Sequence, residues 1–296
     1  MYFKKLHNIC RLFTQKLFDL WKNSLESDKM NLSFFRRKEM DDFIKYNYHA
    51  HTVRCQHADG TEREFIEAAI RMGIRRFCFS DHVPSPAAPG YVSGIRMRMD
   101  EAKEYHDEIK ALADEYKDRI EIFVGFEMEY TPVYFKEQIK LIDSIGFDFL
   151  ILGEHFWTTE EDGPWSGTPT EDEERIRAYV DAVIEAMKTG RFLYVAHPDI
   201  MNYNGQDCVY EWEMTRLCKA AKEMHIPLEI NMIGMKEKKQ YPSKRFFQIA
   251  AEVGCDIIIG LDAHTIEHIT DVETYKECVD FARRLNLHLI DGSDLL

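Results

Sequence analysis

Short apolar runs alternate with longer amphipathic segments along most of the chain. The runs are rich in β-branched and aromatic residues, as buried strands usually are. They predict strands over 45–50, 75–80, 120–126, 147–152, 191–196, 227–231 and 255–261. The segments between them have helical spacing, which predicts helices over Glu62–Met72, Asp100–Tyr116, Glu171–Met187, Tyr210–Met224 and Thr274–Leu285.

This alternation of strands and helices indicates a parallel sheet. The strand runs are apolar throughout rather than at every second position, so we expect both faces of the sheet to be buried. Thr61 and Gly73 stand where the first of these helices should begin and end. No strand is followed by a glycine-rich nucleotide-binding turn. We therefore predict an α/β fold in which one domain, residues 45–296, forms a barrel of seven or eight strands.

Residues 1–44 have a different character and form a predicted N-terminal extension. Within 1–22 basic and apolar residues recur at roughly helical spacing, and Arg11, Lys16 and Asp19 interrupt any run that could serve as a secretory signal. A helix packed on the body, a disordered tail or a start codon assigned too early, with Met30 or Met40 as the true start, all remain open. An amphipathic helix at a membrane surface is a further but less favoured alternative.

Composition narrows the class of protein. The chain has 296 residues, with 38 basic and 52 acidic side chains and a net charge of −14. A chain this acidic is not expected to bind a nucleic acid polymer through a broad basic face. No run of 18 uncharged apolar residues predicts a transmembrane helix. Seven cysteines without CxxC spacing predict neither a disulfide scaffold nor a zinc ribbon, and favour the cytoplasm.

Imidazoles and carboxylates follow nearly every predicted strand. Because the carboxyl ends of parallel barrel strands share one face, residues far apart in the chain should meet there. These nine candidate metal ligands are His49, His51, His57, His82, Glu127, His155, His197, Asp262 and His264. Taken singly, each could be a structural histidine, a rim carboxylate or a helix cap. Together they exceed what one ion needs, so they indicate a centre of two or three ions with Glu127 bridging a pair.

The same residues lie in motifs that resemble the polymerase-and-histidinol-phosphatase (PHP) family, and within it the histidinol-phosphate phosphatase branch. The matching motifs are HAHTVRCQHADGT (49–61), FSDHVP (79–84), GFEMEY (125–130), LILGEHF (150–156), AHPD (196–199), LEIN (228–231) and IIGLDAH (258–264). The resemblance extends from about residue 45 to 292. It implies a distorted seven-stranded (β/α) TIM-like barrel that hydrolyses a phosphate monoester.

The resemblance further implies three divalent transition-metal ions, for which zinc, iron and manganese all remain open. The implied ligand sets are His49, His51, Glu127 and Asp262 for the first ion, Glu127, His155 and His197 for the second, and His57, His82 and His264 for the third. A hydroxide bridging the first two ions would attack phosphorus in line. We expect Asp81 and Asp199 to orient imidazoles or to protonate the leaving group, beside the catalytic ligands Glu127 and His197.

The substrate prediction comes mainly from the resemblance, which implies L-histidinol phosphate. Arg96 and Arg98, in the loop after the second strand, are candidates for a guanidinium that grips phosphate oxygens. Trp157 lies in the connection 156–169, near Phe156 and Trp165, and could stack on an imidazole. We therefore expect a small phosphorylated substrate, and the oligomeric state stays open.

Three other interpretations compete with this one. A barrel of the amidohydrolase type also begins with HxH, but it commonly bridges its metals with a carboxylated lysine, and it would leave His57, His82 and His264 without a role. A PHP module that binds metal without catalysis is a second alternative. The third is a PHP phosphoesterase that acts on another small phosphomonoester or on a nucleotide.

Overall fold

The computed structural model describes residues 43–86, 90–156 and 158–296. Residues 1–42 of the predicted extension lie outside these ranges, and so does Trp157. The strands are β1 (Tyr46–Asn47), β2 (Arg76–His82), β3 (Glu121–Met128), β4 (Phe149–Leu152), β5 (Leu228–Asn231), β6 (Asp256–Gly260) and β7 (His288–Leu289). The α-helices are α2 (Glu62–Arg71), α3 (Ala102–Tyr116), α4 (Pro132–Ile145), α5 (Glu173–Lys188), α6 (Asp207–Glu223), α7 (Met232–Lys236), α8 (Lys244–Val253), α9 (Ile266–Ile269) and α10 (Val272–Arg284), and η1 (Val53–Cys55) is a 3-10 helix.

The strands form two parallel sheets within the described residues, one in the order β1-β2-β3-β4 and one in the order β5-β6-β7. The predicted α/β class and parallel pairing are confirmed, and β2 is buried along its whole length, as predicted for a strand covered on both faces. The strand pairing gives a curled parallel sheet in two parts, and it does not establish the single seven-stranded barrel.

The segment 191–196 differs from its prediction as a full strand. Val195 makes one isolated parallel bridge to Leu152 and another to Leu228, so the segment lies between the two sheets without a ladder of its own. A further bridge, between Ala50 and Ala263, joins the first sheet to the chain after β6. The two sheets are therefore connected through single residue pairs.

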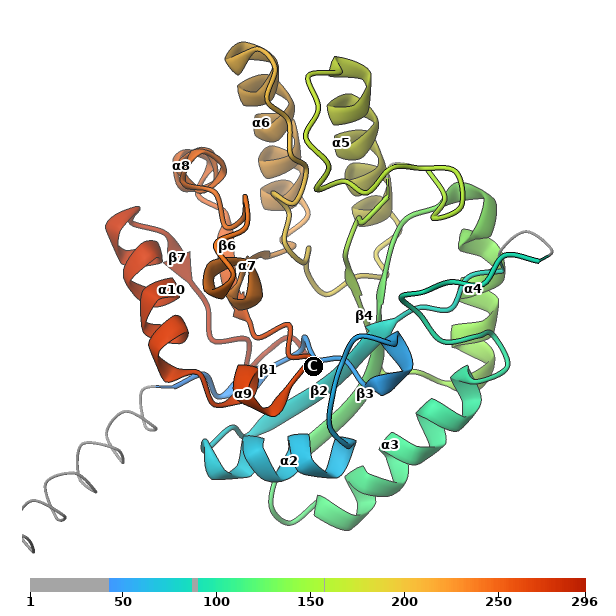
Figure 1. The fold of residues 1–296 in the computed structure, drawn as a ribbon. Coiled ribbons are helices and arrows are strands. Elements are labelled where there is room, and N and C mark those ends of the chain that lie inside the picture. The colour runs from blue at the N-terminus through green and yellow to red at the C-terminus, as the bar shows by residue number, and fades with distance from the viewer. Residues whose placement is uncertain (1–42, 87–89, 157) are drawn as a thin grey trace, which may run out of the picture. The chain divides into compact units, whose positions relative to one another are not determined.

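The helices lie outside the strands, as Figure 1 shows for α2, α3, α4, α5, α6 and α10. Local sequence signals fix their ends. Thr61 forms the predicted cap of α2: its side chain accepts from the backbone N–H of Glu64, whose carboxylate accepts from the backbone N–H of Thr61. Gly73 follows α2 with a φ of 72°, a conformation that favours glycine.

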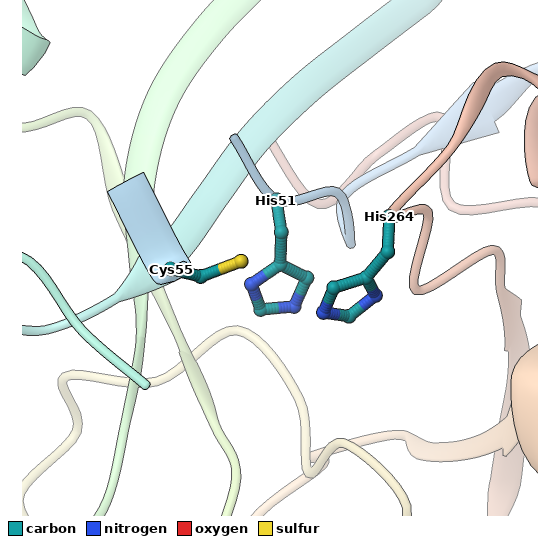
Figure 2. Close-up of side chains that lie close together, drawn as sticks. All are labelled: His51, Cys55 and His264. Atoms are coloured by element: carbon teal, nitrogen blue, oxygen red, sulfur yellow. The ribbon is translucent and has the colours of Figure 1, made fainter. Parts of the chain in front are cut away.

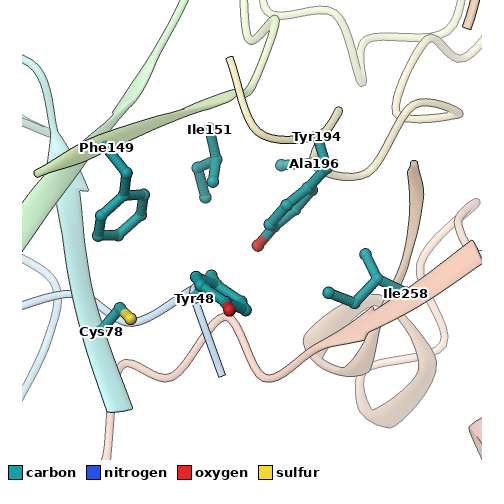
Figure 3. Packing of buried hydrophobic residues seen from close by; sticks show 7 residues of the cluster. All are labelled: Tyr48, Cys78, Phe149, Ile151, Tyr194, Ala196 and Ile258. Carbon is teal, nitrogen blue, oxygen red and sulfur yellow. The ribbon is translucent and has the colours of Figure 1, made fainter. Parts of the chain in front are cut away.

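Side chains from both sheets share one core, shown in Figure 3. This cluster comprises Tyr48, Cys78, Phe149, Ile151, Tyr194, Ala196 and Ile258. Tyr48 contacts Phe149 and Tyr194 edge to face, with ring centroids 6.1 and 6.4 Å apart. The packing places the end of β1 next to β4 and the segment 191–196, and so fixes where the residues that follow these elements emerge.

No helix among the described residues combines the length and the apolar character that a membrane crossing would require.

Candidate metal centre

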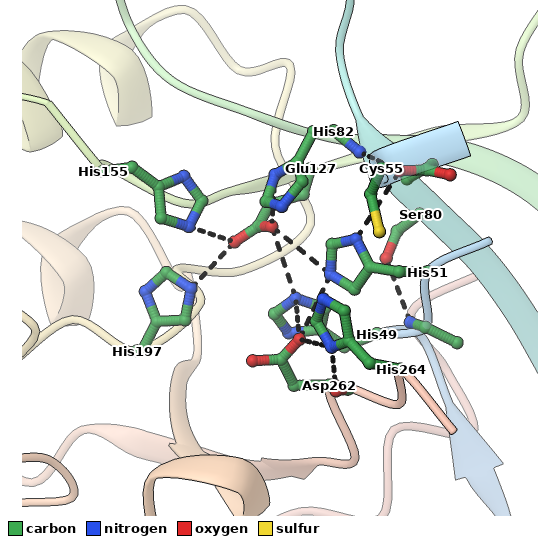
Figure 4. A network of polar contacts seen from close by, with 12 residues as sticks. His49, His51, Cys55, Ser80, His82, Glu127, His155, His197, Asp262 and His264 are labelled. Atoms are coloured by element: carbon green, nitrogen blue, oxygen red, sulfur yellow. Dashed lines mark hydrogen bonds and ion pairs between the residues drawn. The ribbon is translucent and has the colours of Figure 1, made fainter. Parts of the chain in front are cut away.

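The structure brings all nine predicted ligand side chains together beyond the carboxyl ends of the strands, and Figure 4 labels all of them except His57. His49 and His51 follow β1, His82 ends β2, and Glu127 lies near the end of β3. The others follow later elements: His57 after η1, His155 after β4, His197 after the segment 191–196, and Asp262 and His264 after β6. Residues separated by more than 200 positions therefore share one site because parallel strands end on the same side.

Glu127 lies at the centre of the cluster and is 1% exposed. Its Oε2 lies 3.1 Å from His82 Nδ1, 3.5 Å from His49 Nε2 and 3.6 Å from His51 Nε2, and its Oε1 lies 2.8 Å from His197 Nε2 and 3.3 Å from His155 Nε2. Each carboxylate oxygen thus faces a different set of imidazoles. This is the arrangement expected of a carboxylate that bridges two ions.

Asp262 completes the first of these sets. Its Oδ1 lies 3.1 Å from His51 Nε2 and 3.3 Å from His49 Nε2. On the outer side of the cluster, His57 Nε2 and His264 Nε2 lie 2.9 Å apart. The ligand atoms of His57, His82 and His264 all lie within 4.8 Å of one another, so these three residues form a separate potential site.

A cysteine also approaches the cluster, which the sequence interpretation does not anticipate. Cys55 Sγ lies within 4.8 Å of ligand nitrogens of His51 and His264, as Figure 2 shows. The thiol is fully buried, and burial raises its pKa to about 12. The signal was present in the sequence, because Cys55 lies inside the run HAHTVRCQHADGT.

The residues fit divalent transition metals. Among the described residues, the buried atoms without a hydrogen-bond partner include His49 Nε2, His51 Nε2, His82 Nδ1 and both carboxylate oxygens of Glu127. Leaving buried polar atoms unpaired is costly, and a coordinated cation satisfies several of them at once. Imidazole and carboxylate are the donors that zinc, iron and manganese share, so the donor set does not separate these metals.

The charges of the site point to the same conclusion. Burial lowers the pKa of His51, but the neighbouring carboxylates of Asp262, Asp81 and Glu127 outweigh burial and raise that pKa to about 9. Burial likewise lowers the pKa of His155, but Glu127 and Glu129 outweigh burial and raise that pKa to about 10. The carboxylates therefore attract positive charge to the cluster, and bound cations meet that demand while the imidazoles stay neutral.

His82 behaves in the opposite way. Burial, together with the neighbouring positive charge on His51, lowers the pKa of His82 to about 4. Its imidazole is consequently neutral at pH 7, which is the form that binds metal.

Two further carboxylates hold ligand imidazoles from behind. Glu229 accepts a hydrogen bond from His49 Nδ1 at 2.9 Å, and Glu129 accepts one from His155 Nδ1 at 2.8 Å. Asn231 donates to both Glu229 and Asp262, at 2.9 and 3.1 Å. The sequence interpretation assigns no role to these residues, although Glu229 and Asn231 lie in the motif LEIN. Such partners fix the tautomer and orientation of a ligand imidazole.

Two glycines make room for the carboxylates. A Cβ at Gly153 would lie 2.0 Å from Glu127 Oε1, and a Cβ at Gly260 would lie 1.8 Å from Glu229 Oε1. Both glycines end or follow a strand that borders the cluster. Any larger residue at either position would displace a carboxylate of the site.

The backbone is unusual at two of the ligands. His197 and Asp262 have φ values of 29° and 51°, in the region that residues with a side chain rarely adopt. Such conformations cost roughly 1–3 kcal/mol and persist where the surroundings enforce them, commonly at functional sites.

The two predicted catalytic aspartates have different surroundings. Asp81 Oδ1 lies 3.7 Å from His51 Nδ1, and Asp81 also accepts hydrogen bonds from the backbone and hydroxyl of Thr52. Asp199 instead accepts from the backbone N–H of Ser243, the cap of α8. Burial raises the pKa of Asp199 to about 7. Asp81 thus lies behind a ligand, whereas Asp199 fixes the connection before α8.

The structure gives the predicted phosphate-binding arginines other partners. Arg96 is buried, and its guanidinium pairs with Glu129 and Glu160, so it faces no ligand of the cluster. Arg98 is exposed and pairs with Asp100 and Glu101. The sequence showed two basic residues in a loop but not the carboxylates that neutralise them. Trp157, the third predicted substrate contact, lies outside the described residues.

A cavity of about 400 Å³ opens directly over the cluster. Besides metal-ligand candidates, its walls include Trp165, Glu237, Lys239 and Tyr241. The Trp165 ring stacks on His155, with centroids 5.1 Å apart. A larger cavity of about 650 Å³ lies nearby, but none of the nine candidate ligands lines it. The smaller cavity is therefore the place where a substrate would meet the cluster.

Comparison with known proteins gives consistent matches. Residues 47–233 match the model of the PHP domain. A protein of Deinococcus radiodurans named "Probable histidinol-phosphatase" is 30% identical over 230 residues, which cover 73% of this chain and 85% of that protein. The histidinol-phosphatase of Bacillus subtilis is 30% identical over 122 residues, or 39% of this chain and 46% of that protein.

A solved structure shares the fold. The crystal structure of histidinol phosphate phosphatase from Lactococcus lactis, in complex with zinc, L-histidinol and phosphate, aligns with a TM-score of 0.64 at 22% identity, covering 83% of this chain and 95% of that one.

Proposed function

Because this chain belongs to the PHP family and to its histidinol-phosphatase branch, we propose that it hydrolyses L-histidinol phosphate to L-histidinol and phosphate. At the coarser level it is a metal-dependent phosphoric monoester hydrolase. The observation that carries the proposal is the convergence of nine metal-ligand side chains, seven of which line one open cavity. We also propose that the enzyme works in the cytoplasm, as its cysteine pattern predicts.

We propose that three ions bind here, and that the isolated bridges of Val195 and Ala50 complete the distorted seven-stranded barrel of the family. The contacts around Glu127 support one ion beside His49, His51 and Asp262, and a second beside His155 and His197. The grouping of His57, His82 and His264 supports the third. When bound, such ions supply an activated water nucleophile and positive charge that stabilises the phosphoryl group in the transition state.

The protein's own residues hold and orient the reactants. Glu127 lies between the two inner ligand sets, and Asp81 Oδ1 lies 3.7 Å from His51 Nδ1, the ring nitrogen that does not face Glu127. Lys239 is the one lysine or arginine among the described residues that line the cavity. It pairs with Glu237 at 2.8 Å but is 40% exposed, so a phosphate dianion can reach its ammonium group. Trp165 is 40% exposed and stacks on His155, and so offers an apolar wall to the organic part of the substrate.

A panel of phosphomonoesters tests this proposal. The purified protein is loaded with manganese, iron or zinc, and phosphate release is measured from histidinol phosphate, sugar phosphates and nucleoside monophosphates. Steep preference for histidinol phosphate supports the substrate, whereas broad and weak turnover contradicts it and leaves a general metal-dependent phosphoesterase. Absence of turnover with every phosphomonoester in the metal-loaded protein would favour a metal-binding module without catalysis.

Two variants test the metal assignment separately. Glu127→Ala and His264→Ala should each remove most of the activity while the melting temperature shows a folded protein. Normal turnover in both variants would show that these residues do not hold catalytic ions.

A further inference from the structure

We propose that Arg96 and Glu129 are positioning residues that hold His155 in place as a metal ligand. This inference rests on the proposed function, because it concerns how the chain keeps one of the ions. It assigns Arg96 a role that differs from direct phosphate binding.

Glu129 is placed for this role by the strand that carries Glu127. Glu127 lies in β3 and Glu129 directly follows the last residue of that strand, and both side chains reach the same imidazole. Glu127 Oε1 faces His155 Nε2 at 3.3 Å, while Glu129 Oε1 accepts from His155 Nδ1 at 2.8 Å. The imidazole is therefore held at both ring nitrogens by carboxylates from one strand end. Its ring plane and tautomer follow from this double contact.

Arg96 fixes Glu129 in turn. Its Nη1 donates to Glu129 Oε2 at 2.9 Å and its Nη2 donates to Glu129 Oε1 at 3.0 Å, a bidentate pair. The side chains of Arg96 and Glu129 are only 3% and 5% exposed. A buried bidentate pair is strongly directional, and lysine cannot reproduce its fork.

The guanidinium is anchored on its other edges as well. Nε donates to Glu160 Oε2 at 2.6 Å, and Nη1 also donates to the carbonyl oxygen of Val83 at 2.9 Å. Glu160 itself accepts from the hydroxyls of Ser93 and Tyr91, at 2.7 and 2.9 Å. Each nitrogen of the Arg96 guanidinium thus has a protein partner, and four of its five N–H groups donate to protein acceptors.

The consequence concerns retention of one ion. If Arg96 is truncated, Glu129 loses its bidentate partner and no longer holds His155 Nδ1 in one position. Loss of a residue that supports a metal ligand typically weakens metal binding by about 10–100-fold. We expect mainly the ion that His155 helps to bind to be affected, since the described hydrogen bonds of the Arg96 guanidinium, the group that truncation removes, go to Glu129, Glu160 and Val83.

The experiment measures zinc loss from the full-length, zinc-loaded protein. Zinc transfer to a chelating dye is followed for wild type, Arg96→Met, Arg96→Lys, Glu129→Gln and the double variant Arg96→Met/Glu129→Gln. Arg63→Met is the matched control, because Arg63 forms an exposed bidentate pair with Glu115 far from the cluster. Melting temperatures show which variants fold, and Arg96→Lys and Glu129→Gln preserve the test if Arg96→Met does not.

We expect one zinc ion per chain to leave about 10–100-fold faster in Arg96→Met and Glu129→Gln, with Arg96→Lys in between. The double variant should be no worse than the single variants, because the two residues act in series on His155. Excess zinc should restore kcat in Arg96→Met without changing KM. Any of three results would overturn the proposal: zinc retention in Arg96→Met equal to that of Arg63→Met, additive effects in the double variant, or a raised KM with all zinc retained. Zinc loss is measured without substrate, so the outcome is independent of whether histidinol phosphate is hydrolysed.

Discussion

Replacing Gly153 by alanine should remove metal from the site without unfolding the protein. The added Cβ would lie 2.0 Å from Glu127 Oε1, 2.6 Å from Glu127 Cδ and 2.8 Å from Glu127 Cγ. These atoms belong to the end of a side chain rather than to the backbone. The Glu127 side chain can therefore rotate away, so the main effect of the substitution is to displace the Glu127 carboxylate.

The required movement can be worked out from the contact distance. An ordinary contact begins at about 3.4 Å, so Oε1 must move by about 3.4 − 2.0 = 1.4 Å. A displacement of this size separates Oε1 from His155 and His197, the imidazoles that it now faces. Misplacement of a catalytic group by about 1 Å can reduce the rate by roughly 100-fold. Overpacking of this kind typically costs about 1–3 kcal/mol in the free energy of unfolding.

Metal content per chain after dialysis, phosphate release and the melting temperature are measured for Gly153→Ala. Gly94→Ala is the control. A Cβ added at Gly94 would meet no described atom within 4 Å apart from its immediate chain neighbours, and the φ of Gly94 lies outside the left-handed region. We expect Gly153→Ala to lose at least one ion and about 100-fold in rate while it stays folded. Full metal content and wild-type turnover in Gly153→Ala would refute the placement of Glu127 between two ions.

Three further predictions concern the charge and the walls of the site. In the protein stripped of metal by a chelator, the free energy of unfolding should fall as pH rises from about 6.5 towards 10. The folded-state pKa values of His51 and His155, about 9 and about 10, lie above the unfolded value, so the stabilisation from their protonation is complete below about pH 6.5 and is lost as pH rises. In denaturant titrations the zinc-loaded protein should not show this decline, and an equal decline in both forms would contradict the argument. Lys239→Gln should raise KM for a phosphomonoester about 10-fold with zinc content unchanged, whereas Lys188→Gln, which alters an exposed pair on α5, should leave steady-state kinetics unaltered. Trp165→Leu should raise KM for histidinol phosphate more than KM for a small phosphate ester, and an equal effect on both would remove the ring from substrate recognition.

The sequence was most informative where one geometric rule applies to many residues. Parallel strands end on one side, so placing His49, His82, Glu127 and Asp262 at strand ends was enough to predict that they meet. Helix ends followed the same logic, since the cap at Thr61 depends only on residues within one turn.

The remaining features depend on contacts that local patterns do not encode. The run 191–196 has the composition of a strand, yet it pairs at single bridges because its neighbours belong to different sheets. The helix α7 spans five residues, too few for a period to emerge, and β7 spans two. The role of Arg96 could not be read from its loop, because nothing local indicates that Glu129 and Glu160 lie opposite it.

Because the two sheets are joined only through isolated bridges among the described residues, bound ions would also help to hold the two sheets together. Ligands from the first sheet include His51 and Glu127, and ligands from the second include Asp262, while His197 follows the linking segment itself. An ion shared among these residues cross-links the halves of the molecule at the place where the backbone connects them least. Removal of the metal should therefore increase amide hydrogen exchange first at Val195 and Ala263, before any helix on the outside begins to open.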